Sequence, residues 1–394
     1  MGSRVIRARA ADEQLREGIV KIQEELGLRP EFPSEVEQAA KQAAGAARLP
    51  DLDLTSLELL TIDPVGAMDL DQAMHLEADG DGYVVHYAIA DVMAFLEPGD
   101  PVDEEAHERG ESMYGADSKV PLHPPVLSEG AASLLPDEDR PAFVWTIRLD
   151  SAGEVREAKV ERAMVRSRRR LDYEGVQQEI DSADAGSTLA LLKAVGELRL
   201  AQEAARGGVS LPMPAQEVEV ADGRWRLAYR EMLPVESWNA QISLLTGFVA
   251  ASMMLEAEVG IVRTLPPPPD GAVKRLRRTA RALGIDWPNT QEHPEFIRSL
   301  DPSDPAEAAM IVACTTLLRG AGYAGFDGHV PDQAEHAALA SPYAHVTAPL
   351  RRLVDRYGLE VCTAVSAGQD VPAWVRHRLA TLPEMMQESG RRAN

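Results

Sequence analysis

TIDPVGAMDLDQ, residues 61–72, places three carboxylates within nine residues, directly after an apolar run. Asp69 and Asp71 are two positions apart and would point the same way in extended backbone. A turn at residues 64–66 can bring Asp63 back toward them. Carboxylate oxygens with no cysteine or histidine among them suit a hard cation such as Mg²⁺. An acidic loop alone is more often a solvated turn, so a metal site needs support from the rest of the chain.

Strand patterns surround this segment, and helical patterns follow it. Residues 57–64 and 82–96 are apolar and rich in β-formers, and DGDG at 79–82 is typical of a hairpin turn. Two further strands are predicted at 141–150 and 153–165, joined by a turn at 150–153. Long helices are predicted at 186–206, 236–259, 271–283 and 304–321. The pattern predicts an α+β fold, with a mixed sheet flanked by helices.

The two ends of the chain have helical patterns of their own. Residues 11–45 predict two short helices separated by the turn LGLRPEFPSE, and 379–392 predict a last helix. The first pair favours a helix-turn-helix unit and a brace on the main domain about equally. We therefore predict an N-terminal helical segment at 1–45, a catalytic domain at 46–375 and a helical tail at 376–394.

Composition and charge limit the possible partners. The chain of 394 residues has 63 acidic and 40 basic residues, a net charge of −23, which opposes general binding to phosphates. Any nucleic-acid contact must therefore use a local basic lining. We find no apolar run that predicts a membrane span or a secretory signal. The two cysteines, Cys314 and Cys362, are far apart in apolar contexts, which favours a reducing cytoplasm. We expect a cytoplasmic monomer.

The acidic segment resembles the central motif of the RNB family of exoribonucleases, the ribonuclease II and ribonuclease R type. That motif is Thr-Ile-Asp, followed six residues on by Asp-x-Asp-Asp. The resemblance covers about residue 32 to the end of the chain, and several motifs occur in family order. They are HYAIADVMAFLEPGD at 86–100, LDYEGV at 171–176, RGGVSLPMPAQEV at 206–218, SWNAQISLLTGFVAA at 237–251 and HAALASPYAHVTAPLRRLVDR at 336–356.

The resemblance implies an RNB-type fold with a buried channel, and magnesium-dependent hydrolysis of single-stranded RNA from its 3′ end to 5′-mononucleotides. It implies one or two Mg²⁺ ions, for which Mn²⁺ can substitute, and no small-molecule cofactor. Asp63, Asp69 and Asp71 match the metal-binding and catalytic carboxylates, with Asp71 the least dispensable. Arg351 matches the arginine that stabilises developing phosphate charge, a role that suits a guanidinium with its fixed pair of donors.

The same resemblance implies RNA contacts around the carboxylates. Tyr114 matches a tyrosine that stacks on a nucleotide near the 3′ end, and Tyr173 matches a second one near the scissile bond. His345 and Arg352 are secondary candidates for phosphate contact. The basic run at residues 166–170 is on its own more often a solvated face. Because this run closely precedes Tyr173, the sequence favours phosphate contact by Arg166 and Arg168 about as much as a solvated face.

The chain departs from the family at three places. Gln72 replaces the fourth aspartate and keeps one neutral oxygen for a metal, Ala240 and Gln241 replace an acidic pair, and Leu211 stands where an aromatic is common. The favoured hypothesis is an active exonuclease. The alternatives are a catalytically weakened RNA-binding relative, or an acidic protein whose partner is another protein. Family members carry OB-type domains on both sides of the catalytic region, so this chain is either a compact version or a truncated form.

Overall fold

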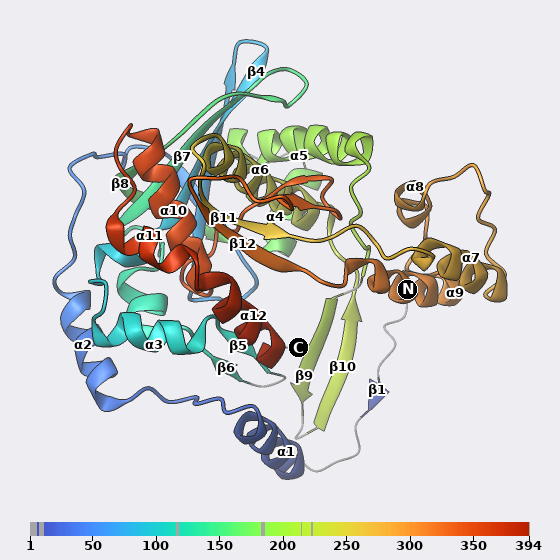
Figure 1. The fold of residues 1–394 in the computed structure, drawn as a ribbon, viewed down its shortest axis with the longest axis horizontal. Coiled ribbons are helices and arrows are strands. Elements are labelled where there is room, and N and C mark those ends of the chain that lie inside the picture. The colour runs from blue at the N-terminus through green and yellow to red at the C-terminus, as the bar shows by residue number, and fades with distance from the viewer. Residues whose placement is uncertain are drawn as a thin grey trace.

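The computed structural model describes residues 6–7, 12–115, 118–182, 186–213, 215–221 and 224–393. Residues 1–5, 8–11 and 394 of the predicted terminal segments lie outside this description. The structure combines a β-barrel with surrounding helices (Figure 1), which confirms the predicted α+β class. Among the described residues, no helix has both the length and the apolarity that a membrane crossing requires.

A closed five-stranded barrel forms the centre of the fold, in the order β2-β3-β4-β7-β8. Its strands are β2 (Leu59–Ile62), β3 (Gln72–Asp79), β4 (Gly82–Ala90), β7 (Asp139–Leu149) and β8 (Val155–Leu171). Neighbours pair antiparallel except β2 and β8, which close the barrel as a parallel pair. Both of these strands therefore end at the same rim, where the Asp63 amide donates to the Leu171 carbonyl over 3.1 Å.

The predicted turns between barrel strands are confirmed. Between β3 and β4, Gly80 adopts a φ of 62°, a conformation that favours glycine. Gly82 is constrained by space, because a Cβ there would lie 2.1 Å from the Leu149 carbonyl oxygen of β7. Between β7 and β8, the Gly153 amide donates to the Asp150 carbonyl at 2.9 Å. These two turns fix the pairing of four of the five strands, β3 with β4 and β7 with β8.

Alternate residues of the barrel strands enter two separate apolar cores. In β4, Tyr87 and Ile89 belong to one apolar core, whereas Ala88 and Ala90 belong to a second one. Helices that contribute to the first core include α5 (Ser187–Arg206), α6 (Pro234–Glu256) and α10 (Leu353–Ser366), and those of the second core include α2 (Ser34–Ala44). The barrel is thus covered by helices on two sides.

The other helices complete the shell. The predicted helices at 186–206, 236–259, 271–283 and 304–321 are confirmed, the last one continuing into a short 3₁₀ turn. The elements not yet named are α1 (Asp12–Glu25), η1 (Val92–Ala94), α3 (Pro101–Arg109), η2 (Leu127–Ala131), α4 (Tyr173–Asp181), α7 (Ala272–Ala282), α8 (His293–Arg298), α9 (Pro305–Cys314), η3 (Thr315–Leu318), α11 (Ala373–Leu379) and α12 (Leu382–Ala393). Figure 1 shows α7, α8 and α9 grouped at one side of the molecule, where they have a core of their own.

Short strand pairs lie outside the barrel. They are β5 (Met113–Tyr114) with β6 (Lys119–Val120), β11 (Val259–Thr264) with β12 (Gly322–Asp327), and β13 (Glu335–His336) with β14 (Ser341–Pro342). A separate sheet joins β1 (Ile6–Arg7), β10 (Arg224–Arg230) and β9 (Ala215–Ala221). The pair β5 and β6 places Tyr114 directly opposite Lys119, which becomes important at the site.

The terminal helices pack on the main body. Val36 and Ala40 of α2 are buried in the second core, which favours a brace over a helix-turn-helix unit. Leu382 and Met386 of α12 are buried in the first core. The division at residues 45 and 375 and the buried channel stay predictions.

Candidate active site

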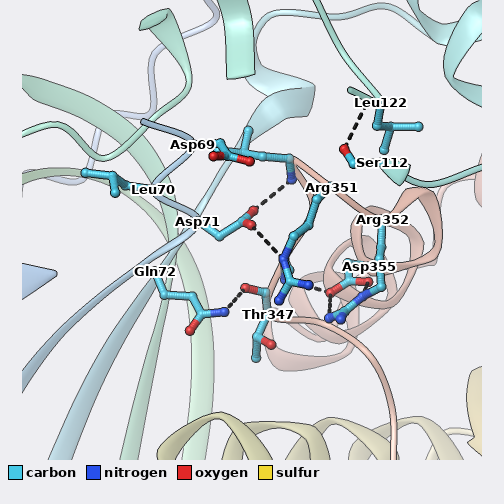
Figure 2. Close-up of polar contacts among 12 residues, drawn as sticks. Asp69, Leu70, Asp71, Gln72, Ser112, Leu122, Thr347, Arg351, Arg352 and Asp355 are labelled. Atoms are coloured by element: carbon cyan, nitrogen blue, oxygen red, sulfur yellow. Dashed lines mark hydrogen bonds and ion pairs between the residues drawn. The ribbon is translucent and has the colours of Figure 1, made fainter. Parts of the chain in front are cut away.

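The acidic segment joins β2 to β3 at one rim of the barrel. Asp63 directly follows β2, and Gln72 is the first residue of β3. A second long loop, residues 343–352, comes from far along the chain and contacts this rim through Thr347 and Leu350. The site is therefore built where these two loops meet (Figure 2).

Asp71 is the most buried carboxylate of the segment, at 5% exposure. Its Oδ1 accepts the Leu350 amide at 2.8 Å, and its Oδ2 lies 3.5 Å from Arg351 Nε, as Figure 2 shows. Burial raises the pKa of Asp71 to about 7, although Arg351 and the Leu350 amide oppose the rise. The Asp71 carboxyl group is therefore poised to change charge near neutral pH.

Gln72 is held by the protein at both ends of its amide. Its Nε2 donates to the Thr347 carbonyl at 2.7 Å, and its Oε1 accepts from the Tyr87 hydroxyl. The Thr347 hydroxyl in turn lies 2.9 Å from that of Ser243 on α6. Gln72 thus ties the start of β3 to the loop that carries Arg351. A metal at Gln72 would have to share Oε1 with Tyr87.

The loop of Arg351 is fixed by Asp355 in the first turn of α10. This fully buried carboxylate accepts the Ala348 amide at 2.7 Å and two donors of Arg352 at 2.7 and 2.8 Å. The side chain of Arg352 is 15% exposed, whereas that of Arg351 is 41% exposed. The two adjacent arginines therefore differ. Arg352 is committed to holding the loop, and Arg351 can reach a ligand above Asp71.

Asp63 and Asp69 are held less completely than Asp71. Asp63 Oδ2 is buried and has no hydrogen-bond partner, and burial together with the charge of Asp69 raises the pKa of Asp63 to about 6. Asp69 Oδ2 lies 3.1 Å from the ammonium of Lys119, which also contacts Glu129 at 2.8 Å. Lys119 is not predicted from the sequence, because nothing in its local pattern marks a basic residue fifty positions from Asp69 as part of the site.

The two predicted tyrosines flank the carboxylates. Tyr114 is 62% exposed, and its pKa is raised by partial burial and by the nearby charge of Asp69. Tyr173 begins α4, and its pKa is raised by burial and by Asp63. One ring therefore lies on the Asp69 side and the other on the Asp63 side. An exposed aromatic ring is available for stacking on a base.

The other predicted RNA contacts have partners within the protein. Arg166 pairs with Asp139 at 2.7 Å, and Arg168 donates to the Thr55 carbonyl at 2.6 Å. His345 Nδ1 lies 2.8 Å from the Tyr323 hydroxyl, and burial together with Arg352 keeps the pKa of His345 well below its usual value. A neutral ring offers no charge to a phosphate. RNA contact by Arg166, Arg168, His345 and Arg352 stays a prediction.

Within the same basic run, Arg170 is the residue whose charge reaches Asp63. It is the penultimate residue of β8 and pairs with Thr61 in the parallel closure with β2. The parallel pairing of β2 and β8, which was not predicted from the sequence, places Arg170 beside the end of β2 that leads into Asp63.

The sequence profile of the RNB domain matches residues 52–361. The chain belongs to the RNB domain family. Its relatives include ribonuclease R of Escherichia coli, 31% identical over 350 residues, and the probable exosome complex exonuclease RRP44 of Caenorhabditis elegans, 28% identical over 341 residues. These alignments cover 84% and 82% of this chain but only 41% and 35% of the relatives. The RNB chain thus corresponds to about two fifths of their length.

Solved structures share the fold of this RNB chain. RNase R of Mycoplasma genitalium, in complex with ribose-methylated single-stranded RNA, matches with a TM-score of 0.83 at 21% identity, over 95% of this chain and 62% of that one. Yeast Ssd1, described as a pseudonuclease, matches with a TM-score of 0.66 at 16% identity, over 89% and 45%. At these identities the likeness concerns the fold alone, and it extends to a protein described as a pseudonuclease.

The donor chemistry of this RNB site fits a magnesium ion. All the candidate ligands are oxygens, and the unpartnered buried Oδ2 of Asp63 has the lone pairs that a cation would use. Among the described residues, however, no three acidic, histidine or cysteine side chains converge on one point. Mg²⁺ commonly keeps several waters and binds through one or two carboxylates plus substrate phosphates, so a preformed cage is not required.

Proposed function

We propose that this RNB chain hydrolyses single-stranded RNA from its 3′ end, in a magnesium-dependent reaction that releases 5′-mononucleotides. The observation that carries the proposal is the buried Asp71 lying beneath the exposed Arg351, with an unpartnered oxygen on Asp63. Family membership and the named relatives support the reaction class.

Each side chain has a role in this proposal. Asp63, Asp69 and Asp71 would hold magnesium, whose chemistry when bound is to activate water and to neutralise phosphate charge. Arg351 stabilises the charge that develops on the phosphate, because its guanidinium is exposed while Asp71 orients it. Tyr114 and Tyr173 stack on bases at the 3′ end and set the position of the last phosphodiester bond.

A second candidate is an RNA-binding relative with weakened catalysis. The observation that favours it is that Gln72 is hydrogen-bonded to Tyr87 and Thr347. With a glutamine at this position, the segment has three carboxylates where the family motif has four. The ion pair between Lys119 and Asp69 occupies one more oxygen.

A gel time course separates the two candidates. A 5′-labelled single-stranded RNA is incubated with the wild type or with Asp71→Asn, in Mg²⁺ or in EDTA. The proposal expects stepwise shortening from the 3′ end that needs metal and stops in the variant. Asp79→Asn is the matched control, because Asp79 is an exposed carboxylate in the β3–β4 turn. If the wild type retains the RNA in a filter assay but leaves it intact, the RNA-binding alternative replaces the exonuclease.

A further inference from the structure

Lys119 is a cation built into the acidic site. Its ammonium lies 3.1 Å from Asp69 Oδ2 and 2.8 Å from Glu129 Oε1, and its side chain is only 24% exposed. Glu129 belongs to η2, outside the acidic segment, and anchors the ammonium from the far side. Two anchors and partial burial restrict the ammonium more than a single exposed ion pair would.

The position of Lys119 also links it to the RNA-facing surface. β5 and β6 pair Tyr114 with Lys119, and directly opposed residues of an antiparallel pair point to the same face. The charge of Lys119 is close enough to affect the pKa of Tyr114. A nucleotide stacked on Tyr114 would therefore bring its phosphate toward Lys119.

The remaining charges leave room for one divalent ion. Arg351 contacts Asp71, and Lys119 contacts Asp69. Of the three carboxylates, Asp63 is the one with a buried oxygen that has no hydrogen-bond partner. A second metal at Asp69 would have to displace Lys119 from Oδ2 or bind through Oδ1 next to the ammonium charge. The neutral Gln72 adds no charge to attract it.

We propose that Lys119 takes the place of a second divalent cation, so that the site holds a single metal ion and the ammonium supplies the second positive charge to the RNA phosphate. This inference rests on the proposed function. It makes Lys119 a substrate-binding residue that also limits the metal content of the site.

The test counts metal ions without RNA hydrolysis. The full chain, as wild type and as Lys119→Met, is titrated with Mn²⁺ alone, and bound ions are counted by electron paramagnetic resonance and calorimetry. We expect one Mn²⁺ per wild-type chain and two per Lys119→Met chain, whereas Lys119→Arg should bind one. The control is Lys159→Met, since Lys159 pairs with Glu161 on β8. Equal stoichiometry in wild type and Lys119→Met would overturn the inference, as would two ions or none in the wild type.

A second measurement tests the contact with phosphate. Binding of a single-stranded RNA in EDTA is measured at several salt concentrations. Loss of one phosphate contact on a single strand should reduce the slope of log K against log salt by about 0.7 in Lys119→Met. The slope should be unchanged in Lys119→Arg and Lys159→Met. An unchanged slope in Lys119→Met would overturn the role in RNA binding.

The two failures are distinguishable. If the RNA is never shortened but the metal counts are one and two, the proposed hydrolysis fails and the role of Lys119 in metal content stands. If the RNA is shortened but the wild type binds two ions, the exonuclease stands and the inference on Lys119 fails.

Discussion

The two halves of the acidic segment are held in opposite ways. In the inner half, Asp71 and Gln72 have their hydrogen-bonding groups engaged by Leu350, Thr347 and Tyr87. The outer half consists of Asp63 and Asp69. Asp63 Oδ2 has no hydrogen-bond partner, and Asp69 Oδ2 contacts the ammonium of Lys119. Buried polar groups are normally satisfied, so the free oxygen of Asp63 can accept a bond from a water, an ion or another ligand. The inner half thus fixes the geometry of the site, and the outer half is where a ligand can bind.

The largest effect should come from Asp71, where the two halves meet. Asp71→Asn keeps the shape of the side chain but removes the charge beneath Arg351, and we expect kcat to fall about a thousandfold. RNA affinity in EDTA should change less than threefold. Single-turnover kinetics and filter binding measure the two effects. Activity within tenfold of the wild type would show that the inner half is only structural.

The adjacent arginines give the next largest effect and a matched pair. Arg351→Lys keeps a charge but loses the fixed fork of donors, so we expect about a hundredfold loss of kcat with no change in Tm. Arg352→Lys should instead lower Tm, because it breaks the two-donor contact with the buried Asp355. Kinetics and thermal melts of both variants check this contrast. The opposite assignment of effects would mean that Arg352, not Arg351, faces the substrate.

Gln72→Asp asks whether the inner half can accept a metal. A carboxylate cannot donate to the Thr347 carbonyl, so this buried acceptor loses its partner, and we expect a loss of about 2 kcal/mol in unfolding free energy. Mn²⁺ affinity should stay within threefold of the wild type. Chemical denaturation and calorimetry provide the two numbers. A tenfold gain in Mn²⁺ affinity would instead place residue 72 among the metal ligands, as the sequence analysis predicts.

The smallest effect is the pH dependence of the unfolding free energy, to which Asp63 of the outer half and Asp71 of the inner half both contribute. The pKa is raised to about 6 at Asp63 and about 7 at Asp71, so the folded state binds protons more tightly than the unfolded chain. The stabilisation is therefore full below about pH 4 and is lost as pH rises through 6 and 7. Each group should lower the metal-free unfolding free energy by up to about 1.4 kcal/mol for each pH unit between its unfolded and folded pKa values. Asp63→Asn should flatten the lower part of the profile, whereas Asp79→Asn should leave it unchanged.

Local patterns in the sequence predicted much of this molecule. The hairpin at 79–82, the long helices and the acidic segment after β2 all follow from periodicity, turn residues and charge. Strand β3 was not predicted. Its sequence QAMHLEAD places Ala73 in one core and Met74 in the other, so apolar and polar residues do not alternate along it as they do in a strand with one buried face. The parallel pairing of β2 with β8 was not predicted either, since strand pairing across a hundred residues leaves no local signal in the sequence.

The site was predicted through its residue types and not through its contacts. Asp63, Asp69, Asp71 and Arg351 were named from the family motif, and the structure gathers Asp71 and Arg351 into one contact. The partners of Gln72 and the ion pair of Lys119 could not be predicted, because each joins loops far apart in the sequence. Such contacts depend on the closed fold, and a motif does not encode them.

The Asp71–Leu350 contact joins a segment that is synthesised early to one that is synthesised late. All five barrel strands lie within residues 59–171, whereas Asp71 and Leu350 are 279 residues apart. Contacts of such long separation form late in folding, after the loop-closure entropy has been overcome. A chain that stops short of residue 350 can hold the acidic segment but not the arginine above it. Under the proposed function, hydrolysis would therefore require that the chain has folded through its last third, because an incomplete chain carries the acidic segment without its arginine.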